Sequence, residues 1–306
     1  MSNLFLPHLV DKFVYYLAER HRIFKRRELN QPVSPGKFTK DPILSTYKFT
    51  NVLRSNDRTT RWLVANWYKP NRHQPPEIQA LNCAIARYFG RIEFLDDIGY
   101  QTSWEPQKII ETAKRRFREK KPVFTGAYII TNQGMRDPKE EIVVNCFLSP
   151  YRNALERLVE IAERTQSWQS VSEGMSGLPG MGPFMTKEIL LDWQLNPVLE
   201  NAKDKLTWTP AGPGAIRGLR RLAGATGNEV SRGSTQQTAL GMMKELMFLV
   251  AEAQGKGQLP SDFPIVGVDF GVTDIQFSLC ELDKYMRVES GEGRPRSLFK
   301  PSKLPL

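Results

Sequence analysis

The chain has 306 residues, enough for one large hydrophobic core or two lobes. Hydrophobic residues make up 40% and charged residues 25% of it, ordinary values for a globular protein that do not favour a largely disordered chain. The formal net charge of +10 favours a polyanionic partner, through long-range attraction and counterion release, although a merely solvated basic surface is the alternative.

Cysteine, histidine and apolar content exclude further classes of protein. Cys83, Cys146 and Cys280 lie far apart with no CxxC, and there are only three histidines. A disulfide framework and a zinc site are therefore not expected, and a reducing cytosol is the simplest setting. The N-terminus lacks the pattern of a signal peptide, and no window reaches the roughly 18 apolar residues of a membrane span. We expect a soluble protein without membrane contact.

Helical periodicity dominates the chain from its start. Leu6, Val10, Phe13 and Leu17 recur at helical spacing, which predicts an amphipathic helix over residues 6–20. Prolines and a glycine predict a loop over residues 30–44. Further helices are predicted over residues 48–67, 77–89, 105–121, 150–165, 188–195 and 236–253.

Signals for other structure are sparse. Strands are predicted only over residues 124–131 and 142–147, and flexible segments over 211–233 and 290–306. Few strands among many helices predict a mostly α fold with a few short strands. We expect one composite helical domain over residues 1–306, or two lobes, 1–150 and 151–306.

A glycine-rich turn stands before the helix predicted at residues 188–195. The segment Leu178–Lys187 reads LPGMGPFMTK, and Gly180 and Gly182 let the backbone turn tightly and approach a partner closely. Unpaired N–H groups at a helix start suit a phosphate oxygen. The segment resembles the helix-hairpin-helix of base-excision DNA glycosylases, which implies DNA-phosphate contacts at Gly180, Gly182, Thr186 and Lys187. An ordinary glycine turn between helices is the alternative.

The hairpin departs from the glycosylase pattern at one position. Bifunctional glycosylases carry a catalytic lysine two residues after the second glycine, where this chain has Phe184. Lys187 follows one helical turn later and should point elsewhere. Lyase chemistry through a Schiff base is therefore not supported.

Polar residues gather again near the C-terminal end. Asp274 closes the string VGVDFGVTD, and Glu281 and Lys284 follow at spacings that place all three on one face of a helix. Carboxylates beside a lysine can take a proton from an amine. A surface helix with a Glu281–Lys284 ion pair is the alternative. The string also matches the DFG triplet of kinases at Asp269, but no glycine-rich or P-loop motif accompanies it.

Taken together, five motifs in order carry a family resemblance over residues 45–290. The chain resembles the phage α-glutamyl/putrescinyl thymine pyrophosphorylases, or amino acid:DNA transferases, and equally the helical domain attached to some 5-hydroxymethyluracil DNA kinases. The motifs are NVLR with DRTTRW from Asn51, FTGAY from Phe124, the hairpin, GPGAIRGL from Gly212, and LCELDKY from Leu279.

The transferase resemblance implies a glycosylase-like helical fold that does not cut the glycosidic bond. Such enzymes act on DNA whose 5-hydroxymethyluracil a partner kinase has pyrophosphorylated, and they replace the pyrophosphate with an amine from an amino acid or a polyamine. The target base is expected to flip out of double-stranded DNA. The setting would be the cytoplasm of an infected bacterium.

Residue roles follow from that chemistry as hypotheses. Arginines suit the charged leaving group, a glycine allows close approach to phosphate, and a carboxylate must deprotonate the amine. For residues 212–214 the alternative to phosphate binding is a simple tight turn. For Asp57 and Arg58 the alternative to binding roles is a structural ion pair. The candidates are Arg54, Arg58, Gly214 and Arg217 for pyrophosphate, Asp274 and Glu281 as bases, Lys284 for the donor's carboxylate, and Asn51, Asp57, Thr125 and Tyr128 for the uracil pocket.

Several points stay open in the sequence. Glycine, glutamate and putrescine all remain as donors. The sequence identifies no cofactor with certainty, and Mg²⁺ is compatible with pyrophosphate departure although no carboxylate cluster demands it. A hydrolytic helix-hairpin-helix DNA glycosylase and a noncatalytic DNA-binding partner of a 5-hydroxymethyluracil DNA kinase are the alternative functions.

Overall fold

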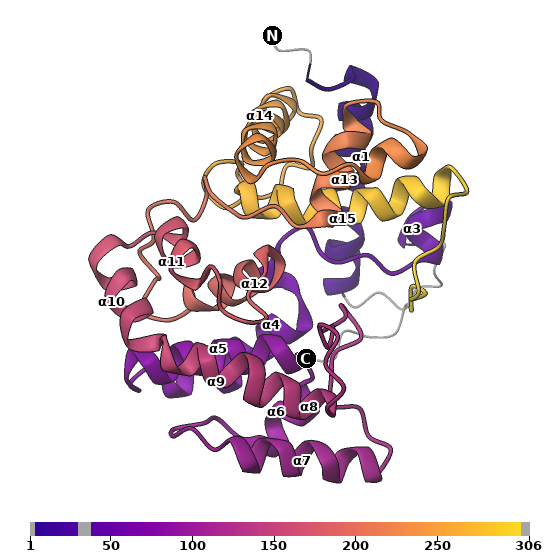
Figure 1. Ribbon diagram of the computed structural model, residues 1–306. Helices are drawn as coiled ribbons and strands as arrows, with labels where there is room; N and C mark the ends of the chain where they lie inside the picture. Colours follow the sequence, from indigo (N-terminus) through magenta and orange to yellow (C-terminus); the bar gives the residue numbers. More distant parts are fainter. Residues whose placement is uncertain (1–3, 30–37, 301–306) are drawn as a thin grey trace. The chain divides into compact units, whose positions relative to one another are not determined.

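A computed structural model describes residues 4–29 and 38–300 (Figure 1). These residues are mostly helical and contain no β-strand, only two isolated bridges. The mostly α class is therefore confirmed, and the few short strands are not found in this part of the chain. Contacts divide the molecule into two compact units: unit 1 comprises residues 1–57 and 206–306, and unit 2 comprises residues 58–205. The predicted lobes 1–150 and 151–306 are not these contact-defined units.

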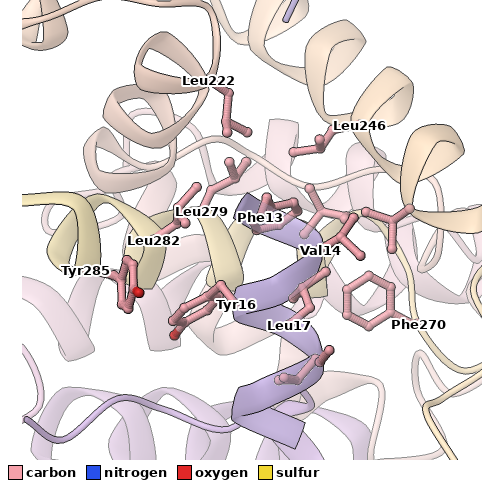
Figure 2. Close-up of a cluster of buried hydrophobic side chains, with 14 of the residues drawn as sticks. Phe13, Val14, Tyr16, Leu17, Leu222, Leu246, Phe270, Leu279, Leu282 and Tyr285 are labelled. Carbon is pink, nitrogen blue, oxygen red and sulfur yellow. The ribbon is translucent and has the colours of Figure 1, made fainter. Parts of the chain in front are cut away.

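Unit 1 is built around two long helices near the C-terminal end and the first helix of the chain. Phe13 and Leu17 of the first helix are fully buried with Leu246, Leu279 and other apolar side chains (Figure 2). Burial of these apolar side chains is the main stabilising contribution to the unit. Its helices are α1 (Pro7–Glu28), α3 (Pro42–Thr46), α13 (Pro213–Leu222), α14 (Gln236–Gly255) and α15 (Val272–Glu289), with 3₁₀ turns η1 (Arg54–Asn56) and η5 (Gly227–Ser231).

Two glycines let α13 lie against α15. A Cβ at Gly218 would stand 2.5 Å from the carbonyl oxygen of Leu279, and a Cβ at Gly214 would stand 2.9 Å from the sulfur of Cys280. The glycines therefore allow backbone contact between the helices. The GPGAIRGL segment is thus the start of a helix, whose N-cap is Gly212, rather than an isolated tight turn.

Unit 2 surrounds α5, whose residues from Gln79 to Phe89 are all buried. Inside it, Asp192 of α12 accepts hydrogen bonds from Tyr68 Oη at 2.6 Å and from Arg87 Nε at 2.5 Å. The unit contains α4 (Arg58–Leu63), η2 (Val64–Tyr68), η3 (Lys69–Asn71), α5 (Pro76–Phe89), α6 (Ile92–Ile98), α7 (Pro106–Arg118), α8 (Lys139–Glu141), η4 (Ile142–Leu148), α9 (Ser149–Asn153), α10 (Leu155–Thr165), α11 (Trp168–Met175) and α12 (Pro183–Trp193).

Several predicted elements need correction. The strand expected at 142–147 is the π-helical segment η4, because an apolar run buried in a helix looks like a buried strand in sequence. Residues 124–131 form no strand. The helix expected over 48–67 is divided into η1, α4 and the π-helical η2.

The expected loops also contain helices. The stretch 211–233 includes α13 and η5, and residues 42–46 of the expected loop form α3. Residues 30–37 of that loop and 301–306 of the expected tail lie outside the described residues. The helices predicted over 77–89, 105–121 and 236–253 are confirmed as α5, α7 and α14, and the one over 150–165 is interrupted between α9 and α10.

Candidate active site

Glu281 of α15 is the centre of a polar cluster inside unit 1. Its side chain is only 5% exposed, because α15 turns this face toward the segment that follows α3. One carboxylate oxygen accepts a hydrogen bond from the Thr50 amide at 3.2 Å, and the other lies 2.5 Å from the Lys284 ammonium. The predicted Glu281–Lys284 pair therefore exists, and Glu281 is also bound to backbone from another part of the chain.

A second carboxylate, that of Asp57, belongs to the same neighbourhood. Asp57 Oδ1 accepts hydrogen bonds from the Asn51 amide at 3.4 Å and from Asn51 Nδ2 at 3.1 Å. Arg54 Nη1 lies 3.5 Å from Asp57 Oδ2. Burial raises the pKa of Asp57 above its ordinary value although the Arg54 charge opposes the shift, and the negative charge of Glu281 adds to the rise. The ion-pair partner that the structure gives to Asp57 is Arg54, three residues before it.

Arg20 of α1 connects these groups, and it is not among the site residues predicted from the sequence. Its guanidinium donates hydrogen bonds to Thr50 O at 2.8 Å, Phe49 O at 3.2 Å and Asn51 Oδ1 at 2.6 Å. Burial lowers the pKa of this arginine, and its Nη1 is buried without a hydrogen-bond partner among the described residues. The signal in the sequence was its position three residues after Leu17, on the buried face of α1.

We call these groups the carboxylate cluster. Two carboxylates and three cations lie together in it, held by backbone amides and carbonyls of the segment 49–51. Its charges interact, since the negative charges of Asp57 and Glu281 both oppose the lowering of the Arg20 pKa by burial. Its members are Arg20, Thr50, Asn51, Arg54, Asp57, Glu281 and Lys284.

Asp274, the other predicted base, lies two helical turns before Glu281. Its Oδ2 accepts a hydrogen bond from the Gly271 amide at 3.0 Å and so caps the N-terminus of α15. An acidic residue in this position also interacts favourably with the helix dipole. Asp274 therefore has a structural role in this arrangement, and a catalytic role for it stays a prediction.

Arg217 and Gly214 lie on α13, also in unit 1. Arg217 Nε donates to Asp283 Oδ2 at 2.8 Å, and Arg221 Nε donates to the other oxygen of Asp283 at 2.8 Å. Asp283 is 1% exposed, so the two arginines compensate a buried charge between α13 and α15. The structure thus gives Gly214 and Arg217 packing roles, and their contact with pyrophosphate stays a prediction.

The remaining pocket candidates lie in unit 2. Arg58 is exposed at the start of α4. Thr125 Oγ1 accepts a hydrogen bond from the Ala127 amide at 3.1 Å, and the Tyr128 hydroxyl donates to the Arg87 carbonyl. The Tyr128 ring stands 5.1 Å from that of Phe184 in an edge-to-face contact. The FTGAY segment therefore places Tyr128 beside Phe184, the position where bifunctional glycosylases carry lysine.

The glycine turn of the predicted hairpin connects α11 to α12, and residues 183–187 of the segment are the start of α12. Gly180 has φ +78°, and a Cβ there would meet the Tyr88 hydroxyl at 2.5 Å, so glycine is needed for the fold itself. Thr186 and Lys187 are buried, at 3% and 1% exposure, and Lys187 Nζ lies 2.9 Å from Glu188. Gly182, the N-cap of α12, is exposed with open space around it. Of the four predicted phosphate contacts, Gly182 is the one best presented at the surface.

Comparison with known proteins identifies the family. The chain matches the family described as "5-hmdU DNA kinase, helical domain" over residues 7–294, a range that includes both the carboxylate cluster and the hairpin. The chain belongs to this family. It is also 30% identical, over 244 residues, to the 5-hmdU DNA kinase of Bacillus phage SP10. No solved structure matches it.

Family membership confirms one of the two related resemblances, the helical domain of the DNA kinases. The match to the phage SP10 protein covers 72% of this chain but 37% of that relative. The chain therefore spans well under half the length of its relative.

Two further properties concern the described residues as a whole. None of the helices described is long and apolar enough to cross a membrane. No group of three or more histidine, cysteine, aspartate or glutamate side chains within residues 4–29 and 38–300 could hold a metal ion. The compatibility with Mg²⁺ stays a prediction.

Proposed function

We propose that this chain modifies phage DNA, replacing the pyrophosphate of 5-(pyrophosphoryloxymethyl)uracil with an amine from an amino acid or a polyamine. Family membership supports action on DNA that contains 5-hydroxymethyluracil, because the relative from a Bacillus phage is named for that substrate. The reaction would take place in the infected bacterial cell. A 5-hydroxymethyluracil DNA kinase would supply the pyrophosphorylated base.

The carboxylate cluster is the observation that carries the proposal. Glu281 has one oxygen bound to a backbone amide and the other to Lys284. An amine is protonated at neutral pH and must lose a proton before it attacks, so a carboxylate fixed in place can serve as the general base. Arg54 and Lys284 supply positive charge for the departing pyrophosphate or the carboxylate of the donor.

The proposed reaction is a substitution at the 5-methylene carbon of the base. Glu281 accepts a proton from the ammonium group, and the neutral nitrogen attacks the methylene carbon. A C–N bond forms as the C–O bond to pyrophosphate breaks, and pyrophosphate leaves with the bonding electrons. The second N–H proton passes to solvent, so no oxidant or reductant is needed.

The hairpin supplies the DNA contact in this proposal. A flipped base requires that the backbone on either side be held, and free amides at a helix start bind phosphate oxygens. Gly182 is exposed at the start of α12, and the ring of Phe184, two residues later, contacts that of Tyr128 edge to face. These rings offer aromatic surface next to the proposed phosphate contact.

The test is mass spectrometry of nucleosides from 5-hydroxymethyluracil DNA treated with kinase, ATP, this chain and a mixture of amino acids and putrescine. We expect a new nucleoside carrying an amine on the 5-methylene carbon. The Glu281→Gln variant should lose it. Glu289→Gln is the matched control, because Glu289 lies on the same helix and pairs with Lys12 at 2.6 Å at the surface. Equal product from both variants would contradict the role of Glu281.

A noncatalytic DNA-binding module for a kinase is the second candidate. It is favoured by the family description, which names a domain of a kinase, and by the 37% coverage of the relative. In that case the chain would stimulate pyrophosphorylation, and no amine-bearing nucleoside would form. A free base released in the same assay would instead indicate a hydrolytic glycosylase.

A further inference from the structure

A cavity of about 350 Å³ lies within unit 1, and no residue of the carboxylate cluster lines it. It is bounded by the second half of α13, the turn η5 and the start of α14. Its apolar lining includes Ile216, Leu219 and Met242, and its polar lining includes Ser234 and Thr238. This volume lies at the lower end of the range for small-molecule sites in proteins.

The same cavity is lined by a cation and an anion that do not neutralise each other. Arg220 uses its Nε to donate to the Glu229 carbonyl at 2.7 Å. Among the described residues, neither the Arg220 guanidinium nor the Glu229 carboxylate has an ion-pair partner within 4.0 Å. One lining therefore carries opposite charges that have no ion-pair partner among the described residues.

The cavity also differs in place from the carboxylate cluster. Glu281 and Asp283 are two residues apart on α15, so their side chains point about 200° apart around the helix. Glu281 faces Thr50, whereas Asp283 faces Arg217 and Arg221 of α13. The cavity lies on the far part of α13, lined by Ile216, Arg220 and Ala223.

We propose that this cavity binds a free α-amino acid with an aliphatic side chain. The carboxylate of the ligand pairs with Arg220, its ammonium group pairs with Glu229, and its side chain packs on Ile216, Leu219 and Met242. A zwitterion satisfies both charges at once, which neither a simple anion nor a simple amine does. The site stands independently of the transferase proposal and is tested without DNA or kinase.

The test is isothermal titration calorimetry of the full chain with L-leucine. We expect saturable binding, and we expect leucinamide, which lacks the carboxylate, and 4-methylpentanoate, which lacks the ammonium group, to bind at least about tenfold more weakly. Arg220→Gln and Glu229→Gln should each weaken leucine binding by about the same factor. Arg232→Gln, an exposed arginine outside the lining, should leave it unchanged.

Other results would overturn the proposal. Absence of saturable leucine binding would do so, as would equal binding of leucine, leucinamide and 4-methylpentanoate. Leucine binding that is lost in Glu281→Gln but kept in Arg220→Gln would place the amino acid at the carboxylate cluster instead. Because the two ligand analogues are tested on the unaltered chain, the proposal remains falsifiable if a variant fails to fold.

Discussion

At the scale of single residues, Arg20 holds the carboxylate cluster together. It binds three acceptors of the segment 49–51, and the same segment gives the Thr50 amide to Glu281 and the Asn51 amide to Asp57. Arg20 is thus a positioning residue, which acts on the two carboxylates through the backbone between them. Its Nη1 is buried without a hydrogen-bond partner among residues 4–29 and 38–300, so this nitrogen can donate to a further ligand only if its surroundings move.

Replacing Arg20 should therefore weaken the folded state strongly. We expect Arg20→Gln to lower the free energy of unfolding by about 3 kcal/mol, because three hydrogen bonds of a buried charge are lost. Arg22→Gln is the control: Arg22 is 41% exposed and pairs with Glu19 at 3.3 Å, so its loss should change the stability by under about 0.5 kcal/mol. Urea denaturation measures both, and similar values for the two variants would contradict the role of Arg20.

The raised pKa of Asp57 makes a prediction about pH. A carboxyl group whose pKa is higher in the folded state than in the unfolded state contributes stability at low pH, and this contribution is lost as the pH rises through the folded-state pKa. Asp57→Asn cannot titrate. The stability of this variant relative to the unaltered chain should therefore increase as the pH rises from the ordinary aspartate range to neutrality. Chemical denaturation across that range measures the difference, and a decrease would contradict the burial argument.

At the scale of elements, the close contact of α13 with α15 organises unit 1. Residues 211–233 are rich in glycine, which predicts that they are flexible. In the structure, Gly214 and Gly218 instead allow α13 and α15 to pack closely. Glycine has a low helix propensity, so local sequence reasoning could not find this helix. The packing of α13 against α15 outweighs the low helix propensity of its glycines.

Two helical glycines test this explanation. Gly218→Ala should lower the free energy of unfolding by about 1–3 kcal/mol, because its Cβ would overlap the Leu279 backbone. Gly241→Ala in α14 should instead raise it by up to about 1 kcal/mol, since Gly241 is exposed and nothing lies within 4 Å of the added Cβ. Thermal and urea denaturation report both changes. A stabilising effect of Gly218→Ala would contradict the close approach of α13 and α15.

In unit 2, α5 and α12 are joined by a buried ion pair. Asp192 is fully buried, and Asp192→Asn should cost about 3–5 kcal/mol because the Arg87 charge loses its partner. The surface pair Arg72–Glu200 provides the control, and Glu200→Gln should cost less than about 1 kcal/mol. Equal losses in urea denaturation would show that the buried pair contributes no more than an exposed one.

At the scale of the whole molecule, the sequence predicts the class of fold and the family better than the site. Helical spacing found α5, α7 and α14, and the LPGxG motif found the hairpin, because these are local patterns. The carboxylate cluster joins residues from α1, the segment 49–57 and α15. Spacing along the chain could suggest Glu281 with Lys284 but could not bring Arg20 to Thr50 and Asn51, since those contacts depend on tertiary packing.

The central question is whether this chain itself modifies a pyrophosphorylated base. The most direct measurement separates the two steps in time: 5-hydroxymethyluracil DNA is treated with kinase and ATP, freed of both, and only then given this chain and an amine mixture. Our account predicts pyrophosphate release together with an equal amount of amine-bearing nucleoside. DNA that keeps its pyrophosphate throughout, although this chain binds it, would contradict the account.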